Sequence, residues 1–377
     1  MCIEGRSMAR LRILHVYKDF EPPVFGGMER HIALMCRFQR EWADVEALTC
    51  SRSLRSGVVE RDGTKVTEVG EWGRFQSAPV SPLFPFYMRL KKADVVVVHV
   101  PNPTAEIGWL LTRPKGRLVV RYHSDVVRQA AAMKVYRPFQ QALLKNAEVI
   151  IPTSQNYLDT SATLIGFKDK CRVISLGMIP EDFANPDVSL MDSYRQRYGE
   201  KYLLFAGRHR YYKGLHVLVE AAQWIDAPIV VAGDGPERGK LEAQARELGV
   251  EIRFPGPLSQ EEMVAHLHGS SVVAFPSIER SEAFGISIME AHACRKPVVA
   301  TKLGTGVEFI NADGVTGINV PVGDARAFSD AVNKLMNDDT LREEYGATAK
   351  ARIESEFDAR HIARLEYELF EEMVHAH

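Results

Sequence analysis

Two glutamates on either side of a glycine turn have residue types that suit a ligand made of phosphate and sugar. Glu282 and Glu290 stand eight positions apart, and Phe284, Gly285 and Ile286 lie between them. A helix that starts after a glycine presents unpaired N–H groups to a phosphate, and carboxylates accept hydrogen bonds from sugar hydroxyls. We predict that the turn backbone holds a phosphate, with Glu282 near it and its sugar and Glu290 on a ribose diol. Because the two carboxylates would have different ligands, they do not suit an acid and base pair at one bond. The alternative is a solvated helix with ordinary surface charges.

Two cations follow an apolar run earlier in the chain. Arg208 and Lys213 flank a short loop, next to Gly207 and Gly214. Arginine offers a planar fork of donors and lysine a point charge, so this pair suits a diphosphate. We predict a diphosphate clamp that stabilises a leaving group, with Arg210 as a competitor for either role. Solvated basic residues on a turn are the other interpretation.

Two features of the first half of the chain also lie where predicted strands end. Gly26 and Gly27 open a predicted helix, where the backbone can approach a phosphate; a plain strand-to-helix turn is an equal alternative. His123 ends the fourth clear strand, in the segment R-Y-H-S-D, where its imidazole can exchange a hydrogen bond with a sugar hydroxyl. A histidine that satisfies neighbouring backbone is the alternative there, and Asp125 is expected to cap the next helix.

A third loop, A-G-D-G-P-E-R, follows another predicted strand. Gly233, Gly235 and Pro236 fix a tight turn before a helix, but the third glycine of a dinucleotide fingerprint is missing. We therefore expect this loop to shape a nucleoside pocket rather than to hold a pyrophosphate. Phe254 could supply an apolar wall for one face of a base, and core packing is an equally good interpretation of that ring.

These loops need a scaffold that brings strand ends together. Short β-branched runs alternate with amphipathic segments in two successive series, which is typical of parallel sheets covered on both faces. The pattern predicts an α/β protein with two facing Rossmann-like, doubly wound domains and a cleft between them, because ligands bind beyond the carboxyl ends of such strands. The predicted boundaries are residues 8–180 for the first domain, 199–356 for the second domain, and 357–377 for a last helix. The expected strands are residues 11–17, 45–50, 95–100, 118–122 and 149–152, then 202–206, 229–232, 252–254, 272–275 and 297–300, each of the second series followed by a helix except the last.

Composition narrows the class of protein. The 377 residues are 46% hydrophobic and 25% charged with a net charge of −2, so nucleic acid is not the expected partner. The five cysteines form no C-x-x-C pair, no apolar run is long enough to span a membrane, and a cytoplasmic protein is expected. No D-x-D motif is present, so we expect no metal and no other cofactor. The start M-C-I-E-G-R-S is similar to a protease recognition tag, and residues 1–7 are set aside in favour of a start at Met8.

Taken together, the motifs resemble those of the GT-B-type retaining glycosyltransferases of family 4, also called group 1, of the bacterial polysaccharide and lipid-linked glycan type. The resemblance covers nearly the whole chain from Met8. It rests on G-R-x-x-x-x-K-G at 207–214 and E-x7-E at 282–290, supported by A-G-D-G-P and K-P-V-V-A-T. Arg295 stands where the family usually has glycine, and His292 where methionine is common; both follow the binding motif.

The resemblance implies a role for each motif. Residues 8–180 would be the acceptor-side domain, and the helix 357–377 would cross back to it. The donor-binding domain, 199–356, would bind most of a nucleotide-sugar donor, with Arg208 and Lys213 on its diphosphate and Glu290 on its ribose. Glu282 and the amides of 284–286 would meet the donor sugar and phosphate. Gly27 would approach the diphosphate, and His123 would contact the transferred sugar. The implied reaction moves a hexosyl group to a glycan or lipid-linked saccharide with retention of configuration, and analogy slightly favours GDP-mannose over UDP-hexoses.

The sequence leaves two other functions open. A GT-B-type nucleotide-sugar epimerase would use the same pocket but needs further acid and base carboxylates around the sugar. A non-catalytic nucleotide-sugar-binding partner subunit is the third reading, although Arg208, Lys213, Glu282 and Glu290 are all present. Residues 82–92 mix aromatic and basic side chains, and the helix after His123 carries cations, so peripheral contact with the inner membrane face is a further expectation, with a packed helix and ordinary solvated lysines as the alternative. Those cations are Arg128, Lys134, Arg137 and Lys145.

Overall fold

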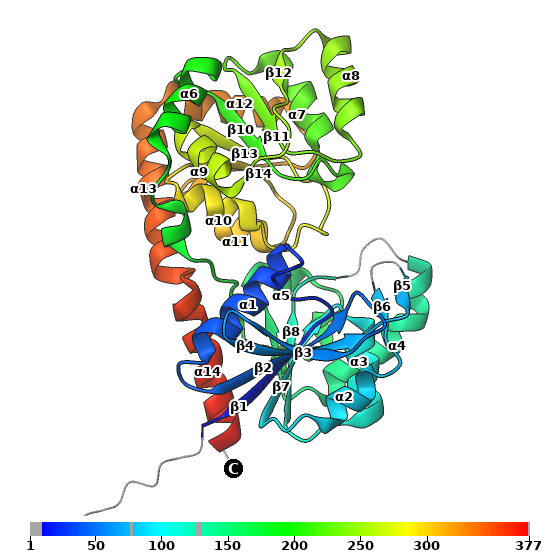
Figure 1. Ribbon diagram of the computed structural model, residues 1–377. Helices are drawn as coiled ribbons and strands as arrows, with labels where there is room; N and C mark the ends of the chain where they lie inside the picture. The colour runs from blue at the N-terminus through cyan, green and yellow to red at the C-terminus, as the bar shows by residue number, and fades with distance from the viewer. Residues whose placement is uncertain (1–9, 76–77, 126–129, 376–377) are drawn as a thin grey trace, which may run out of the picture. The chain divides into compact units, whose positions relative to one another are not determined.

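The chain forms two compact units. The computed structural model describes residues 10–75, 78–125 and 130–375. Unit 1 contains the chain up to Thr153, the segment Ser161–Gly177 and the chain from Ala359 onward; unit 2 contains Ser154–Thr160 and Met178–Asp358 (Figure 1). Each unit is built on its own sheet, so the chain enters unit 2 and returns to unit 1 for its last helix.

Unit 1 has a seven-stranded sheet in the order β3-β4-β2-β1-β7-β8-β9. Every neighbouring pair is parallel except β3 and β4, which are antiparallel. The inner strand β7, next to the central strand β1, is V-V-V-V-H-V and is buried at all six positions, as expected for a strand covered on both faces. The strands of unit 1 are β1 (Arg12–Val16), β2 (Asp44–Ser51), β3 (Gly57–Arg61), β4 (Thr64–Gly70), β7 (Val95–Val100), β8 (Arg117–Tyr122) and β9 (Val149–Pro152), with the small hairpin β5 (Gly73–Phe75) and β6 (Ala78–Val80).

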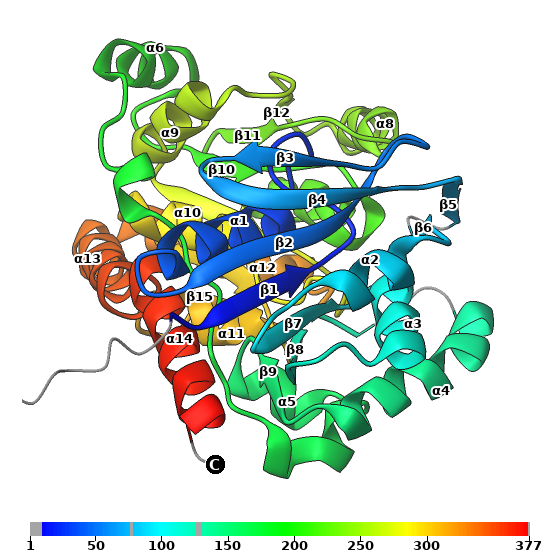
Figure 2. The same ribbon diagram turned by 60° about the horizontal axis from the view of Figure 1, so that its bottom comes forward.

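Helices cover both faces of this sheet (Figure 2). The first and last helices, α1 and α14, pack against each other on one face, while α2, α3 and α4 lie along the other. This arrangement follows from right-handed crossovers, because the chain moves outward from β1 in both directions. The helices of unit 1 are α1 (Gly27–Gln39), α2 (Phe84–Leu90), α3 (Pro103–Thr112), α4 (Ala130–Asn146), the 3-10 helix η1 (Leu164–Lys170) and α14 (Ala359–His375).

A buried ion pair fixes α14 to unit 1. Arg121 of β8 is fully buried, and its Nε atom lies 3.2 Å from Oε1 of Glu366, which is also buried. The guanidinium also donates to the carbonyl oxygens of Ile174 and Ser175, at 2.6 and 2.7 Å. Because an unpaired charge in such a place is strongly destabilising, the last helix is an integral part of the core of unit 1.

Unit 2 has a six-stranded sheet in the order β12-β11-β10-β13-β14-β15, with every neighbouring pair parallel. Its strands are β10 (Leu203–Ala206), β11 (Ile229–Ala232), β12 (Ile252–Arg253), β13 (Val272–Phe275), β14 (Val298–Thr301) and β15 (Gly317–Val320). Its helices are α5 (Gln155–Thr160), η2 (Pro180–Phe183), α6 (Val188–Tyr198), η3 (Tyr211–Lys213), α7 (Leu215–Ala221), η4 (Ala222–Trp224), α8 (Arg238–Leu248), α9 (Gln260–Gly269), α10 (Ile286–Ala293), α11 (Gly306–Ile310), α12 (Ala325–Asn337) and α13 (Asp339–Glu356).

All the strands predicted from β-branched runs are present, and the structure adds β3 to β6 and β15. One expectation about helices was wrong. The strand near residue 300 is followed by the short helix α11, because Thr305 and Glu308 form a capping box that starts one. The stretch 180–198, expected as a boundary, contains η2 and α6, and the Asp187 side chain caps α6 through the amides of Ser189 and Leu190.

Candidate functional site

The predicted cationic loop of unit 2 leaves the sheet at the carboxyl end of β10. Gly207 follows the strand, η3 forms a single turn that ends at Lys213, and Gly214 has a positive φ of 65°. A Cβ atom on Gly214 would clash with the carbonyl of Pro276, so this loop packs directly on the chain that follows β13. The close approach brings the two halves of the predicted motif, the cations and the glutamates, to the same edge of the sheet.

Lys213 and Glu282 form a direct ion pair there. The Nζ atom lies 2.5 Å from Oε2 of Glu282, and the two side chains are only 14% and 13% exposed. The ammonium also lies 5.0 Å from the ring centroid of Phe275. Burial by itself lowers the pKa of Lys213, but the negative charge of Glu282, with a smaller contribution from Glu290, raises it above its ordinary value. Lys213 is therefore a protonated cation at neutral pH.

The glycine turn before α10 has the geometry that its sequence predicts. Gly285 adopts a positive φ of 92° and directly precedes the first residue of the helix, Ile286. Phe284 is buried, and the backbone carbonyl of Glu282 accepts a hydrogen bond from the Thr305 hydroxyl at 2.9 Å. The burial of Phe284 and the hydrogen bond from Thr305, the N-cap of α11, thus hold the turn in place. Its helix start leaves backbone N–H groups without helical partners.

Glu290 lies on α10, one turn beyond its start, and is half-buried. Arg208 is exposed on the loop after β10, as is Arg210. The structure therefore brings Lys213, Glu282 and Glu290 together electrostatically, whereas Arg208 extends from the same loop into solvent.

The loop after β11 is packed against the loop after β10, backbone to backbone. Gly233 has a φ of 114°, and a Cβ atom there would clash with the carbonyl of Gly207. At Gly235 a Cβ atom would lie 2.5 Å from the carbonyl oxygen of His209, whose own amide donates to the carbonyl of Asp234 at 2.9 Å. These glycines are needed because no side chain fits between the two loops.

His209 is a residue that sequence reasoning missed. It stands between two exposed arginines, yet its side chain is fully buried, and neither ring nitrogen has a hydrogen-bond partner within the described part of the chain. The ring centroid is 6.3 Å from that of Phe254 in an edge-on arrangement, and burial lowers the pKa of His209. Phe254 is half-buried and packs on the hydrophobic core of unit 2, which agrees with the core-packing interpretation of this ring. The apolar ring of Phe254 and the polar ring of His209 thus lie side by side, beyond the ends of β12 and β10.

The predicted residues of unit 1 lie at the carboxyl ends of β1 and β8. Gly26 immediately precedes α1, and a Cβ atom on it would clash with the carboxylate of Glu29, which is therefore close to the helix start. Gly27 is the first residue of α1. His123 directly follows β8 and is 3% exposed, with its Nε2 atom 2.9 Å from Nδ1 of His99. Their roles toward a ligand stay predictions.

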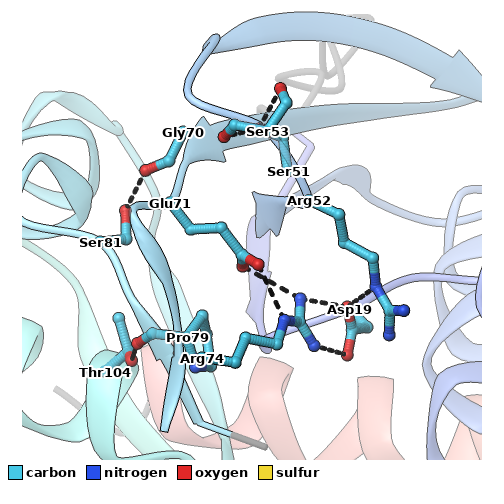
Figure 3. A network of polar contacts seen from close by, with 10 residues as sticks. All are labelled: Asp19, Ser51, Arg52, Ser53, Gly70, Glu71, Arg74, Pro79, Ser81 and Thr104. Carbon is cyan, nitrogen blue, oxygen red and sulfur yellow. Dashed lines mark hydrogen bonds and ion pairs between the residues drawn. The ribbon is translucent and has the colours of Figure 1, made fainter.

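A second group that the sequence did not reveal surrounds Asp19, just beyond β1 (Figure 3). Arg74 of the β5–β6 hairpin donates to both carboxylate oxygens of Asp19, each at 2.7 Å, and to Glu71 at 2.9 and 3.0 Å. Burial alone would raise the pKa of Asp19, but the two nearby guanidinium groups, those of Arg74 and Arg52, lower it below the ordinary value. This network attaches the hairpin to the edge of the sheet at which β1 ends. The partners are far apart in sequence, so no local pattern indicated it.

A buried carboxyl group lies beyond β7. Glu106 of α3 accepts hydrogen bonds from the backbone N–H of Asn102 at 2.8 Å and from the Tyr136 hydroxyl. Full burial raises the pKa of Glu106 to about 7. A lone glutamate in an apolar helix gave no sequence signal for this environment.

Comparison with known proteins assigns the family. A model described as glycosyl transferases group 1 matches residues 190–352, and one described as a glycosyl transferase 4-like domain matches residues 26–177. A D-rhamnosyltransferase of Pseudomonas aeruginosa, WbpZ, is 36% identical over 353 residues, 93% of either chain. The chain belongs to the group 1 glycosyltransferases. The O-antigen chain mannosyltransferase C of Escherichia coli is 34% identical over 93% of this glycosyltransferase and 96% of that protein.

Solved structures show the same GT-B fold. Sucrose-phosphate synthase from Thermosynechococcus elongatus superposes with a TM-score of 0.80 at 21% identity, covering 98% of this glycosyltransferase and all of that chain. The Anabaena protein HepE in complex with UDP and glucose gives 0.76 at 19% identity, covering 96% and 100%. The described residues of the glycosyltransferase contain no cluster of three or more metal-ligating side chains. None of the helices described is long and apolar enough to cross a membrane.

The packing of the two loops predicts the effect of a single methyl group. Gly233→Ala should lower the free energy of unfolding by about 2 kcal/mol or more, because the residue has a positive φ and its Cβ would meet the carbonyl of Gly207. Calorimetric unfolding of both variants measures this. Gly239→Ala is the control: nothing lies within 4 Å of a Cβ there, in α8, so a gain of roughly 0.5–1 kcal/mol is expected. Equal stability of the two variants would contradict the close packing.

Proposed function

We propose that this glycosyltransferase moves a hexosyl group from a nucleoside-diphosphate sugar to a glycan or lipid-linked saccharide, with retention of configuration and without a metal ion. The observation that carries the proposal is the meeting of Lys213 and Glu282 at the carboxyl end of the sheet of unit 2, beside the helix start after Gly285. A cation and free helical N–H groups suit a diphosphate, and carboxylates suit sugar hydroxyls.

The electrostatics favour departure of a nucleoside diphosphate. Lys213 is held protonated by its anionic neighbours, in a place that is mostly shielded from water. In such surroundings a fixed charge stabilises a developing phosphate anion more than it would in water. Arg208, exposed on the same loop, can extend to a second phosphate oxygen. These groups would stabilise the negative charge of the leaving diphosphate, as a divalent cation does in other transferases.

The proposed reaction balances without an enzymic nucleophile. The acceptor oxygen forms a bond to the anomeric carbon on the face that the diphosphate leaves, and the bond from that carbon to the phosphate oxygen breaks. The hydroxyl proton passes to the departing phosphate oxygen, and configuration is retained because the new bond forms on the face that the diphosphate leaves. Glu282 is engaged by Lys213, which suits a sugar-positioning role better than nucleophilic attack.

The relatives support a hexose or deoxyhexose donor of the mannose type. One is named a D-rhamnosyltransferase and another an O-antigen chain mannosyltransferase, which favours GDP-mannose and a polysaccharide acceptor. HepE, with UDP and glucose, is a likeness of fold alone. We propose that the glycine loop after β11, with Phe254 and His209, forms the nucleoside pocket. An epimerase would need acid and base groups around the sugar and would turn over its donor without an acceptor.

Nucleotide binding tests the donor site. Thermal unfolding with GDP, UDP or ADP at a hundredfold excess over the dissociation constant should show one nucleotide adding ~2.7 kcal/mol to the free energy of unfolding. We expect GDP to raise the midpoint by several degrees and UDP and ADP to leave it unchanged. A shift with UDP alone would replace the mannose assignment. No shift with any nucleotide or with GDP-mannose would contradict the donor site.

Removal of the cation tests the role of Lys213. Lys213→Ala should lower acceptor-dependent turnover at least about a hundredfold, because charge-assisted bonds to the leaving diphosphate are lost. Lys201→Ala, which removes an exposed lysine paired with Asp339, is the control and should keep wild-type turnover. Both are assayed by transfer from radiolabelled donor, with and without EDTA. Normal turnover in Lys213→Ala would remove the clamp from the mechanism, and loss of wild-type activity in EDTA would reject metal independence.

We also propose peripheral contact of unit 1 with an anionic membrane. Leu83, Phe86 and Leu90 are 55–60% exposed at helical spacing along α2, and Arg89 and Lys92 are exposed beside them. On α4, Arg137 and Lys145 are exposed, whereas Arg128 and the side chain of Lys134 lie outside what the structure describes.

Vesicles of phosphatidylglycerol should co-sediment with the enzyme at low salt and release it at high salt. Phe86→Ser should weaken binding severalfold because it removes apolar area from the contact face. Val58→Ser, at a position with the same 60% exposure on β3, is the matched control and should bind as the wild type does. Absence of salt-sensitive binding would count against the contact.

A further inference from the structure

Three histidines on neighbouring strands of unit 1 form a diagonal line through its core. His15 of β1 is paired with Val97 of β7, two residues before His99. His99 is in turn paired with Arg121 of β8, two residues before His123. Because side chains alternate between faces with a period of two, all three imidazoles point to the same face. Each one lies two residues closer to the carboxyl end of the sheet than the last.

The three rings are joined by hydrogen bonds. The His15 Nδ1 atom is 2.9 Å from Nε2 of His99, and the His99 Nδ1 atom is 2.9 Å from Nε2 of His123. At the lower end, His15 Nε2 lies 2.8 Å from Oε1 of Gln39 on α1, whose Nε2 donates to Oε2 of Glu366 at 3.1 Å. None of these side chains is more than 3% exposed. A continuous polar chain thus runs from α14 to the end of β8.

The imidazoles in this chain are neutral. Burial lowers the pKa of His15 to about 4 and lowers the pKa values of His99 and His123 well below the ordinary value. The positive charge of Arg121 acts in the same direction. His31 of α1 faces His99 and His123 edge-on, with ring centroids 6.5 and 5.8 Å away, and burial lowers its pKa as well. A neutral imidazole has one donor and one acceptor nitrogen, so one hydrogen bond determines the next.

The carboxylate of Glu366 sets the direction of the chain. Burial raises the pKa of Glu366, and the Arg121 guanidinium 3.2 Å away opposes this and favours the ionised form. An ionised carboxylate only accepts, so the Gln39 amide must turn its NH2 group toward it and its oxygen toward His15. His15 then donates through Nε2 and accepts through Nδ1. The same assignment follows in turn for His99 and for His123.

The geometry points to a fixed tautomer of His123: its Nε2 carries the proton, and its Nδ1 is a hydrogen-bond acceptor held ready at the carboxyl end of β8. No group within the described residues donates to that Nδ1 atom. The Nδ1 atom accepts a hydrogen bond from a hydroxyl group of the sugar that is transferred. This ligand rests on the proposed function, whereas the tautomer does not. His99, His15, Gln39 and Glu366 are positioning residues that act through His123.

Every hydrogen bond from residue 366 to His123 reverses its direction if the side chain at position 366 becomes a donor. With a protonated or amide group at position 366, the Gln39 oxygen could accept from it and its NH2 could donate to His15 Nε2. Each ring would then donate through Nδ1, and His123 would offer an N–H where it had offered a lone pair. The site would meet the sugar oxygen as a donor instead of an acceptor.

Histidine tautomers are measured directly by long-range ¹H–¹⁵N correlation spectra of the ¹⁵N-histidine-labelled full-length enzyme. Single replacements of His15, His99 and His123 assign the signals and serve for nothing else. We expect all three residues as neutral Nε2–H tautomers from pH 6 to 8. A His123 that is protonated, or that carries its proton on Nδ1, overturns the proposal.

Two variants separate positioning from folding. Glu366→Gln should convert a measurable fraction of His123 to the Nδ1–H form and lower kcat about threefold to tenfold, the effect of one neutral hydrogen bond. Gln39→Leu breaks the chain but keeps the pair of Arg121 and Glu366, so it tests the same point if the first variant is unstable. Glu372→Gln makes the same chemical change at an exposed position of α14 and should alter neither tautomer nor kcat.

The outcomes distinguish this inference from the proposed function. A folded Gln39→Leu or Glu366→Gln enzyme that keeps His123 entirely as the Nε2–H form shows that the chain does not set the tautomer. A wild-type enzyme with the expected tautomers that transfers no sugar leaves the chain in place and rejects the proposed ligand instead.

Discussion

Parallel strands place all their carboxyl ends on one edge of a sheet, and the loops that leave this edge must share a small space. In unit 2 the loops after β10 and β11 touch backbone to backbone, and Gly207 and Gly233 leave no room for a Cβ atom between them. The loop ending at Gly214 is equally close to the chain after β13. This crowding brings Lys213 to Glu282, although 69 positions separate them. The charge arrangement of the site is therefore a result of sheet topology.

The two units handle their polar groups in opposite ways. In unit 2 the charged pair of Lys213 and Glu282 lies in loops at the sheet edge, and the strands β10, β11 and β13 are apolar. Unit 1 places histidines and an arginine within the strands themselves, where each needs a buried partner. The cost is that several elements must be correctly placed together. The gain is a histidine at a strand end whose ring cannot turn without disturbing its neighbours.

Local sequence patterns were sufficient to predict most of the fold and part of the candidate site. Buried strands such as β7 and β11 are continuous apolar runs, and the glycine turn before α10 has its own signature. The strand β3 is mostly exposed and has no such run, so its pattern was not distinctive. Sequence placed His123 correctly just after a strand but did not indicate its burial. His15, His99 and Asp19 were missed because their partners come from distant segments, and only the folded sheet brings them together.

The return of α14 to unit 1 has a consequence for how the protein is made. Gln39 and its carboxylate partner Glu366 are 327 positions apart, with the whole of unit 2 between them. A ribosome releases the strands of unit 1 first, but Arg121 has no counter-ion until the codons of α14 have been read. Domains generally fold in the order of their synthesis. Here unit 1 is the first to emerge and is completed only after unit 2, so a stop codon between unit 2 and α14 removes part of the core of unit 1 and leaves every residue of unit 2 in place.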